Sequence, residues 1–100
     1  MAFVFLYTTA PPQNATFIVK TLLEQKLIAC ANIFPVQSVY RWQEKIRHER
    51  EVVLILKTTT KKSVLAQKVL EKIHPYKIPC VTRICVQPNE RYATWLLEQL

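Results

Sequence analysis

The sequence contains no glycine among its 100 residues. Glycine normally fills turn positions that require a positive φ angle, because it lacks a Cβ atom. Six prolines and several asparagines must therefore shape the turns of this chain. Any turn that needs a positive φ angle has to place a residue with a side chain there.

Long apolar runs are also missing. No stretch approaches the roughly 20 apolar residues that a membrane-spanning helix needs. The first residues, MAFVFLYTTAPP, carry no basic segment ahead of their apolar part, whereas a secretory signal peptide would have one. We therefore expect no membrane segment, and we interpret these first residues as a strand.

The cysteines form neither pairs nor motifs. Cys30, Cys80 and Cys85 are an odd, scattered set without a CxxC spacing. Small secreted domains instead use even sets of cysteines as a disulfide framework. We predict reduced thiols in a cytoplasmic protein, and each cysteine is most simply explained as a small buried hydrophobic residue.

Acidic residues are few, and the seven of them face fourteen Lys and Arg residues, which gives a formal net charge of +7. The basic residues are dispersed, and their longest run is Lys61-Lys62. Neither an RNP-like aromatic motif nor a helix-turn-helix pattern accompanies them. We therefore predict a solvated basic surface and no nucleic-acid partner.

Motifs of the common enzyme classes are absent. The sequence has no glycine-rich phosphate loop, no HExxH and no nucleophile elbow, and its acidic residues form no obvious carboxylate pair. Cys30 and His74 would imitate a Cys–His pair only if the fold brought them within hydrogen-bond distance. We predict that the protein is not an enzyme.

Two apolar-rich runs, residues 33–42 and 52–56, dominate what the sequence does contain. They are rich in β-branched and aromatic residues, and the charged segment QEKIRHERE joins them. This pattern predicts a long β-hairpin, whose return strand is apolar on both faces. The hairpin would project beyond the sheet of one domain, so its edges must be paired or protected.

Strands and helices alternate along the rest of the chain. The patterns predict a strand over residues 2–8, a helix over 13–25, a strand from 27 into the hairpin, a helix over 60–73, a strand over 79–86 and a helix over 90–99. Thr9, Thr60 and Asn89 are candidate N-caps. Pro35 marks its strand as an edge or a bulge, and Pro75 ends the second long helix.

This order indicates an α+β fold of one domain, residues 1–100. It is the ferredoxin-like split β-α-β arrangement, βαββαβ, with an added C-terminal helix.

Four segments together resemble the CutA divalent-cation-tolerance family. They are TTAP at 8–11, LIACANIFP at 27–35, the hairpin segments SVYRWQEKI at 38–46 and EVVLILKT at 51–58, and HPYKIP at 74–79. The similarity extends over nearly the whole chain. The resemblance implies a ferredoxin-like fold assembled as a very stable homotrimer, in which the long hairpins pair between subunits.

One residue departs from the family pattern in the hairpin. Relatives usually carry glycine after the Trp-x pair, and this chain has Glu44 there. We expect a turn of different geometry or a longer, looser loop, and we expect the trimer to survive the change.

The resemblance also implies a role in tolerance of copper and other divalent ions. The ligand positions that it implies are a cysteine before TAP and two histidines before PY, and here they hold Thr8, Ile73 and His74. A single imidazole makes a poor copper or zinc site. We expect no specific high-affinity site, and weak binding at His74 or the cysteines stays open. The simpler explanation of His74 is that it ends a helix.

A second set of residues suits a small ligand. In the resembled fold, the hairpin and the exit of the second helix approach a cleft between subunits, where ligand sites are common. The cleft candidates are Cys30, Tyr40, Trp42, Lys57 and Tyr76. The simpler alternative is that Tyr40 and Trp42 anchor the subunit interface.

These observations lead to one hypothesis and one alternative. The hypothesis is a cytoplasmic, non-catalytic homotrimer that acts in tolerance of divalent metal ions such as copper. The alternative is a ligand-sensing trimer, comparable to the nitrogen-regulatory signalling proteins, that binds an anionic ligand in the cleft between subunits through Lys57, Arg41 or Arg83.

Overall fold

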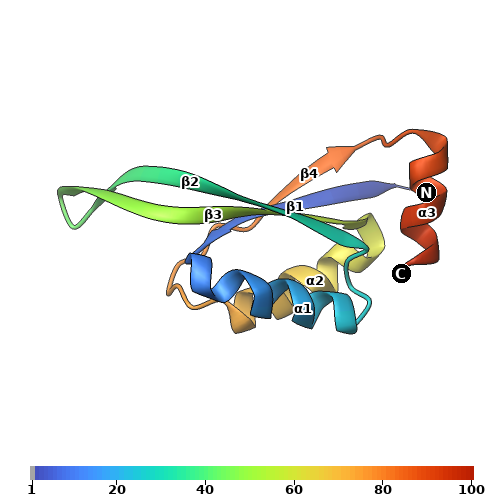
Figure 1. The fold of residues 1–100 in the computed structure, drawn as a ribbon, viewed down its shortest axis with the longest axis horizontal. Coiled ribbons are helices and arrows are strands. Elements are labelled where there is room, and N and C mark those ends of the chain that lie inside the picture. The colour runs from blue at the N-terminus through green and yellow to red at the C-terminus, as the bar shows by residue number, and fades with distance from the viewer. Residues whose placement is uncertain (1) are drawn as a thin grey trace.

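The computed structural model describes residues 2–100 and contains one sheet with two helices packed on one of its faces (Figure 1). The elements follow in the order β1 (Phe3–Ala10), the 3-10 helix η1 (Pro12–Asn14), α1 (Ala15–Glu24), β2 (Cys30–Trp42), β3 (Lys45–Thr59), α2 (Thr60–Ile73), β4 (Thr82–Val86) and α3 (Glu90–Glu98). Within residues 2–100, no helix is long and apolar enough to cross a membrane.

The four strands pair antiparallel in the order β2-β3-β1-β4. The central strands are therefore β1 and β3, and the edges are β2 and β4. Leu6 of β1 lies opposite Leu56 of β3 on one side and Arg83 of β4 on the other. This topology confirms the ferredoxin-like split β-α-β fold predicted from the sequence.

The main core lies between the sheet and the helices α1 and α2. Because side chains alternate along a strand, every second residue of β1 and β3 points into this layer. Its completely buried members are Val4, Leu6, Ala10, Ile18, Leu22, Leu54, Leu56, Ala66 and Leu70. Burying each leucine or isoleucine contributes roughly 1.5–3 kcal/mol, so this layer supplies most of the driving force for folding.

The opposite face of the sheet is apolar but only partly covered. Phe5, Tyr7 and Ile55 lie there on the central strands and are half-buried. Phe34 and Ile84, on the two edge strands, are each 43% exposed. We call these five residues the open-face band. Helix α3 lies at one end of the sheet (Figure 1), where its Leu96 is buried in one cluster with Phe3 and Ala29.

Strands β2 and β3 form a long arm that projects past the helices (Figure 1). They stay in register from Cys30–Lys57 to Trp42–Lys45, and the molecule measures 45 × 23 × 20 Å as a result. Pro35 pairs with Val52 within this continuous register, so it lies in an edge strand without a bulge. The two apolar faces predicted for residues 52–56 are also confirmed, because these residues are buried or half-buried.

The turn of the arm differs from the expected loop. Trp42 pairs with Lys45, so only Gln43 and Glu44 form the turn, with φ angles of 51° and 66°. Two positive φ angles are the geometry of a type I′ hairpin, which matches the twist of the strands. Of the two alternatives expected for this turn, the longer, looser loop is wrong: the turn has two residues and places two side chains in left-handed geometry.

Two of the predicted helix caps were also wrong. Thr9 lies inside β1, which continues to Ala10. The N-cap of α2 is Thr59, whose Oγ1 accepts a hydrogen bond from the Lys62 amide at 3.1 Å. Asn89 does precede α3, although its side chain makes no capping hydrogen bond.

Several element boundaries moved as well. The first strand, predicted over 2–8, is Phe3–Ala10, and the strand predicted from residue 27 begins at Cys30. The predicted helix over 13–25 is divided into η1 and α1, because Pro12 opens a short 3-10 turn first. The last strand begins at Thr82, three residues later than predicted. Helix α2 has the predicted bounds and ends at Ile73; His74 is its C-cap and has an extended backbone, as expected for the residue before Pro75.

Candidate functional site

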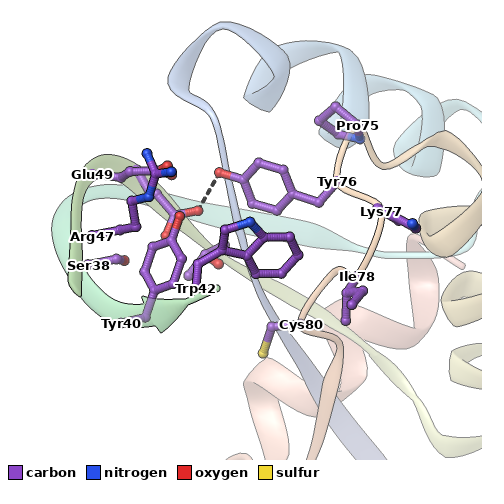
Figure 2. A pocket seen from close by; sticks show the side chains of 12 residues that line it. Ser38, Tyr40, Trp42, Arg47, Glu49, Pro75, Tyr76, Lys77, Ile78 and Cys80 are labelled. Atoms are coloured by element: carbon purple, nitrogen blue, oxygen red, sulfur yellow. Dashed lines mark hydrogen bonds between the residues drawn. The ribbon is translucent and has the colours of Figure 1, made fainter. Parts of the chain in front are cut away.

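A cavity of about 680 Å³ lies where the arm meets the connection between α2 and β4. Figure 2 shows its lining side chains. The arm and the connection contribute most of them: Ser38, Tyr40, Trp42, Arg47, Glu49, Glu51, Pro75, Tyr76, Lys77, Ile78 and Cys80, with Thr9 from β1. We call this cavity the arm pocket.

Strand alternation brings the arm residues to one side. Tyr40 and Trp42 are two residues apart on β2, so both rings project from the same face of the arm. Their cross-strand partners on β3 are Arg47 and Lys45, and Glu49 lies two residues beyond Arg47 on that same face. The arm therefore presents aromatic and charged side chains together to the connection.

Tyr76 links the connection to the arm. Its hydroxyl donates a hydrogen bond to Glu51 Oε2 at 2.5 Å, and Glu51 is only 6% exposed (Figure 2). Hydrogen bonds to an ionised carboxylate are short and strong. Burial, followed by the bond to Glu51 and its negative charge, raises the pKa of Tyr76 well above its usual value. The tyrosine is therefore held protonated, as the donor to Glu51.

Tyr40 lies in a similar electrostatic environment nearer the turn. The neighbouring Glu49 carboxylate is the main cause that raises the pKa of the Tyr40 hydroxyl, and Arg47 opposes it more weakly. Trp42, two residues further along the strand, is 42% exposed and shows a large part of its indole to solvent. The arm side of the pocket is thus aromatic and electrostatically negative.

His74 is buried behind the pocket and makes hydrogen bonds through both ring nitrogens. Nδ1 accepts from the Tyr76 amide at 3.1 Å, so the proton of a neutral ring resides on Nε2, which donates to the Thr9 carbonyl at 2.8 Å. The ring also packs on Tyr76, with 4.9 Å between the ring centroids. Metal coordination by His74 would require breaking one of these two bonds.

The other ligand positions implied by the resemblance offer no donors that complete a metal site. Thr8 is fully buried, and the side chain of Ile73 is a hydrocarbon. Among residues 2–100, no group of three or more His, Cys, Asp or Glu side chains lies close enough to hold a metal ion. The residues present therefore do not fit a dedicated copper or zinc site.

Two of the predicted cleft residues lie away from the arm pocket. The Cys30 thiol is 3.2 Å from the Tyr92 hydroxyl, and Lys57 Nζ donates to the same hydroxyl at 3.3 Å. The bond to Cys30 and then burial raise the pKa of Tyr92, while Lys57 opposes them. The ammonium of Lys57 also lies over the rings of Tyr92 and Phe5, at 5.2 and 5.3 Å.

The predicted cleft set is therefore divided into two groups. Tyr40, Trp42 and Tyr76 meet in the arm pocket, whereas Cys30 and Lys57 meet at Tyr92 of α3. Cys30 and His74 take part in separate hydrogen-bond networks, so the Cys–His pair considered from the sequence does not form.

The cations of the predicted anion site do not line the arm pocket either. Arg41 pairs with Ile46, on the face of the arm opposite Tyr40. Arg83 pairs with Leu6, on the helix-covered side of the sheet. Lys57 lies at the other end of β3, beside α3.

Sequence reasoning missed the carboxylates of the pocket. Glu49 and Glu51 were assigned to a linking segment, but that segment is the first half of β3. A signal was available: a two-residue turn at 43–44 pairs Trp42 with Lys45 and so places Glu49 opposite Ser38, on the Tyr40 face. The expectation of buried cysteines also needs correction, because Cys80 and Cys85 are exposed and Cys30 is half-buried.

Comparison with known proteins adds a consistent set of similarities. The profile of the CutA1 divalent ion tolerance protein family matches residues 3–99. The divalent-cation tolerance protein CutA of Pyrococcus horikoshii is 40% identical over an alignment of 98 residues that covers 96% of each chain. That of Thermus thermophilus is 35% identical and covers 95% of this chain and 94% of its own.

Solved structures show the same similarity in three dimensions. CutA1 from Ehrlichia chaffeensis superposes with a TM-score of 0.93 at 39% identity, covering 97% of this chain and 94% of its own. A protein from Archaeoglobus fulgidus, described as the periplasmic divalent cation tolerance protein CutA, has a TM-score of 0.92 at 35% identity and covers 97% of both chains.

Proposed function

The chain belongs to the CutA1 divalent ion tolerance protein family, and from this premise we propose that it works as a non-catalytic homotrimer. In this proposal the chain is one domain, and it acts in divalent-cation tolerance by binding a small ligand at the arm pocket. The observation that carries the proposal is this pocket, which joins three aromatic rings to buried and exposed carboxylates.

Exposed apolar surface supports self-association. The open-face band leaves Phe34 and Ile84 each 43% exposed, and on the arm Val39 and Ile46 are 60% and 56% exposed. Apolar surface of this kind typically marks a contact with another protein chain. A second observation is the arm itself, an edge strand of 13 residues whose outer side needs a partner or protection.

Light scattering during size-exclusion chromatography tests the trimer. The chain mass is 11.7 kDa, so the expected particle has three times that mass. A mass equal to that of one chain at micromolar concentration would refute the assembly.

For metal ions, we propose weak binding without a dedicated site. Both nitrogens of His74 are engaged, whereas His48 lies exposed on the arm. Calorimetry with Cu(II) should give weak binding that His48→Ala reduces more than His74→Ala does. Tight, stoichiometric binding that His74→Ala abolishes would contradict this part of the proposal and restore the metal site implied by the resemblance.

Ligand binding at the arm pocket has its own test. In a thermal-shift screen with nucleotides, organic anions and organic cations, at least one class should raise the melting temperature of the wild type. Trp42→Ala should lose that shift, whereas Val64→Ala, on the exposed side of α2, should retain it. Loss of the shift in both variants would argue against a specific pocket site.

We also propose a cytoplasmic location, supported by three cysteines that form no disulfide, two of them exposed. The Archaeoglobus relative, described as periplasmic, provides the competing expectation. Cell fractionation combined with thiol labelling distinguishes the two: free, labelled thiols in the soluble cytoplasmic fraction support the proposal, and recovery in an extracytoplasmic fraction refutes it.

A further inference from the structure

The arm pocket has the composition of a site for organic cations. Its side walls include the rings of Tyr40 and Trp42 from the arm and of Tyr76 from the connection. Aromatic faces attract cations through the ring quadrupole, and most strongly where several rings surround one cation. Figure 2 shows the indole of Trp42 between the arm tyrosine and the connection, with Tyr76 beside it. The cavity volume of about 680 Å³ lies within the usual range for small-molecule sites.

Carboxylates reinforce this preference. Glu49 and Glu51 both line the pocket, and Glu51 is nearly buried. A carboxylate that is shielded from water interacts with a nearby charge more strongly than an exposed one does. Glu51 already accepts one hydrogen bond, from Tyr76, which leaves its negative charge in place at the wall of the pocket.

The pKa values of the two tyrosine hydroxyls reflect these carboxylates in part. The pKa of Tyr40 is raised first by its hydrogen bond to Glu49, and that of Tyr76 first by burial and then by its hydrogen bond to Glu51; the negative charges of Glu49 and Glu51 raise both pKa values further. A negative charge is therefore unfavourable at both hydroxyls. The same field would oppose an anionic ligand and favour a cationic one.

The basic residues of the pocket do not outweigh this field. Lys77 lines the rim, and its side chain is directed away from the three rings in Figure 2. Arg47 lies beside Tyr40 on the arm, and its effect on the Tyr40 pKa is smaller than that of Glu49. The three cations expected to hold an anion lie elsewhere, as described above.

We propose that the arm pocket binds a small organic ammonium cation, held between Tyr40, Trp42 and Tyr76 and neutralised by Glu49 and Glu51. This inference rests on the proposed ligand-binding role of the same pocket and names the chemical class of its ligand. It differs from the anionic ligand that the sequence offered as the alternative.

Tetramethylammonium is a suitable first probe, and tert-butanol is its neutral counterpart of similar shape. Binding is measured by calorimetry on the assembled protein. We expect saturable binding of tetramethylammonium and at least roughly tenfold weaker binding of tert-butanol, since only the former carries the charge that the rings and carboxylates attract. Equal binding of the two would overturn the charge-based assignment.

Variants locate the binding. Trp42→Ala should weaken it by roughly tenfold, because tryptophan is the strongest aromatic partner for a cation. Glu49→Gln preserves shape and should weaken it by about threefold through loss of one nearby charge. Glu44→Gln is the matched control, because it removes one charge from the turn of the same arm, outside the pocket lining, and it should leave the affinity within about twofold.

The indole of Trp42 provides a second readout that does not depend on heat. The chain has two tryptophans, so Trp95→Phe leaves Trp42 as the single indole fluorophore. Its emission should change saturably with tetramethylammonium.

The outcomes distinguish the cation assignment from the more general proposal that the arm pocket binds a small ligand. If citrate or a nucleotide binds in a Trp42-dependent way and tetramethylammonium does not, the pocket remains a ligand site and the cation assignment fails. If neither class binds, both the ligand role and the cation assignment fail. Equal loss of tetramethylammonium binding in Glu44→Gln and Glu49→Gln would also refute the assignment, since it would indicate only the net charge of the arm.

Discussion

His74 shows how one residue type can support two different interpretations. From the sequence, it was a helix terminator or the remnant of a metal site. The structure shows a buried imidazole that joins β1, through the Thr9 carbonyl, to the amide of Tyr76. Since both nitrogens are used, His74 fixes the position of the connection that carries one wall of the arm pocket.

We predict that His74→Ala destabilises the fold. The substitution leaves the Tyr76 amide without its His74 partner and leaves the Thr9 carbonyl with only the longer bond from Thr8 Oγ1 at 3.4 Å. Each group left buried without a partner costs about 1–3 kcal/mol. Guanidinium unfolding measures the loss. His48→Ala, which removes the exposed histidine of the arm, is the matched control and should change the free energy of unfolding by less than about 0.5 kcal/mol. Equal, small effects would refute the positioning role of His74.

Tyr76 gives a pH prediction with a definite sign. Its pKa is raised in the folded chain, so the protonated form is favoured there. The stabilisation is fully present below the ordinary tyrosine pKa of about 10 and is lost as the pH rises through the higher folded value. The advantage of the wild type over Tyr76→Phe should therefore be constant at neutral pH and shrink at strongly alkaline pH.

Unfolding at a series of pH values checks this sign, with ultraviolet titration of the native proteins alongside. Tyr76→Phe should leave the tyrosinate absorbance that develops near pH 10 unchanged, because Tyr76 ionises later. A difference between the two titrations near pH 10 would contradict the raised pKa.

At the scale of elements, the arm combines a correct prediction with an incorrect one. The β-branched and aromatic runs predicted both strands, because such residues suit pleated, half-buried surfaces. The charged segment concealed the first half of β3, because an exposed strand in a projecting arm has no buried face to impose apolar alternation. The strand register explains the tight turn, because Trp42 pairs with Lys45 and leaves only two residues between them.

Glu44→Gly should stabilise the arm. A left-handed residue other than glycine costs roughly 1–2 kcal/mol, and glycine gives back part of that through its greater freedom in the unfolded chain. The expected net gain is about 0.5–1 kcal/mol in the free energy of unfolding. Glu44→Ala removes the same charge but keeps a Cβ atom, so it should give no gain. Equal stabilisation by both variants would point to charge instead of backbone geometry.

At the scale of the whole molecule, the sequence predicted the topology but not the position of the pocket. The ferredoxin-like order follows from element types and from short connections. The separation of Cys30 and Lys57 from Tyr40 and Trp42 does not follow from them. It depends on the length of β2 and β3, because the two pairs of residues lie toward opposite ends of these strands. Only the register and the path of the connection show which side chains meet.

The open-face band gives a prediction on assembly. Ile84→Glu places a charge in this band, where burial against a neighbouring chain would be costly. We expect the particle mass in light scattering to fall toward that of one chain. Val64→Glu adds the same charge on the outer side of α2, where the residue is 50% exposed, and should leave the mass unchanged. An unchanged mass in Ile84→Glu would place the interface elsewhere.

Pro35 has a consequence for how the chain avoids fibres. It pairs in register with Val52 at the sheet edge, and a proline is tolerated there only where its missing N–H faces outward. The free side of β2 therefore presents one gap in its row of donors. A strand from another chain can pair with this edge only in registers that place no carbonyl acceptor opposite Pro35. The proline therefore restricts how other copies of the chain can add to the sheet. Pro35→Val would fill the gap and permit slipped, open-ended strand addition, a route to aggregation that the native edge blocks.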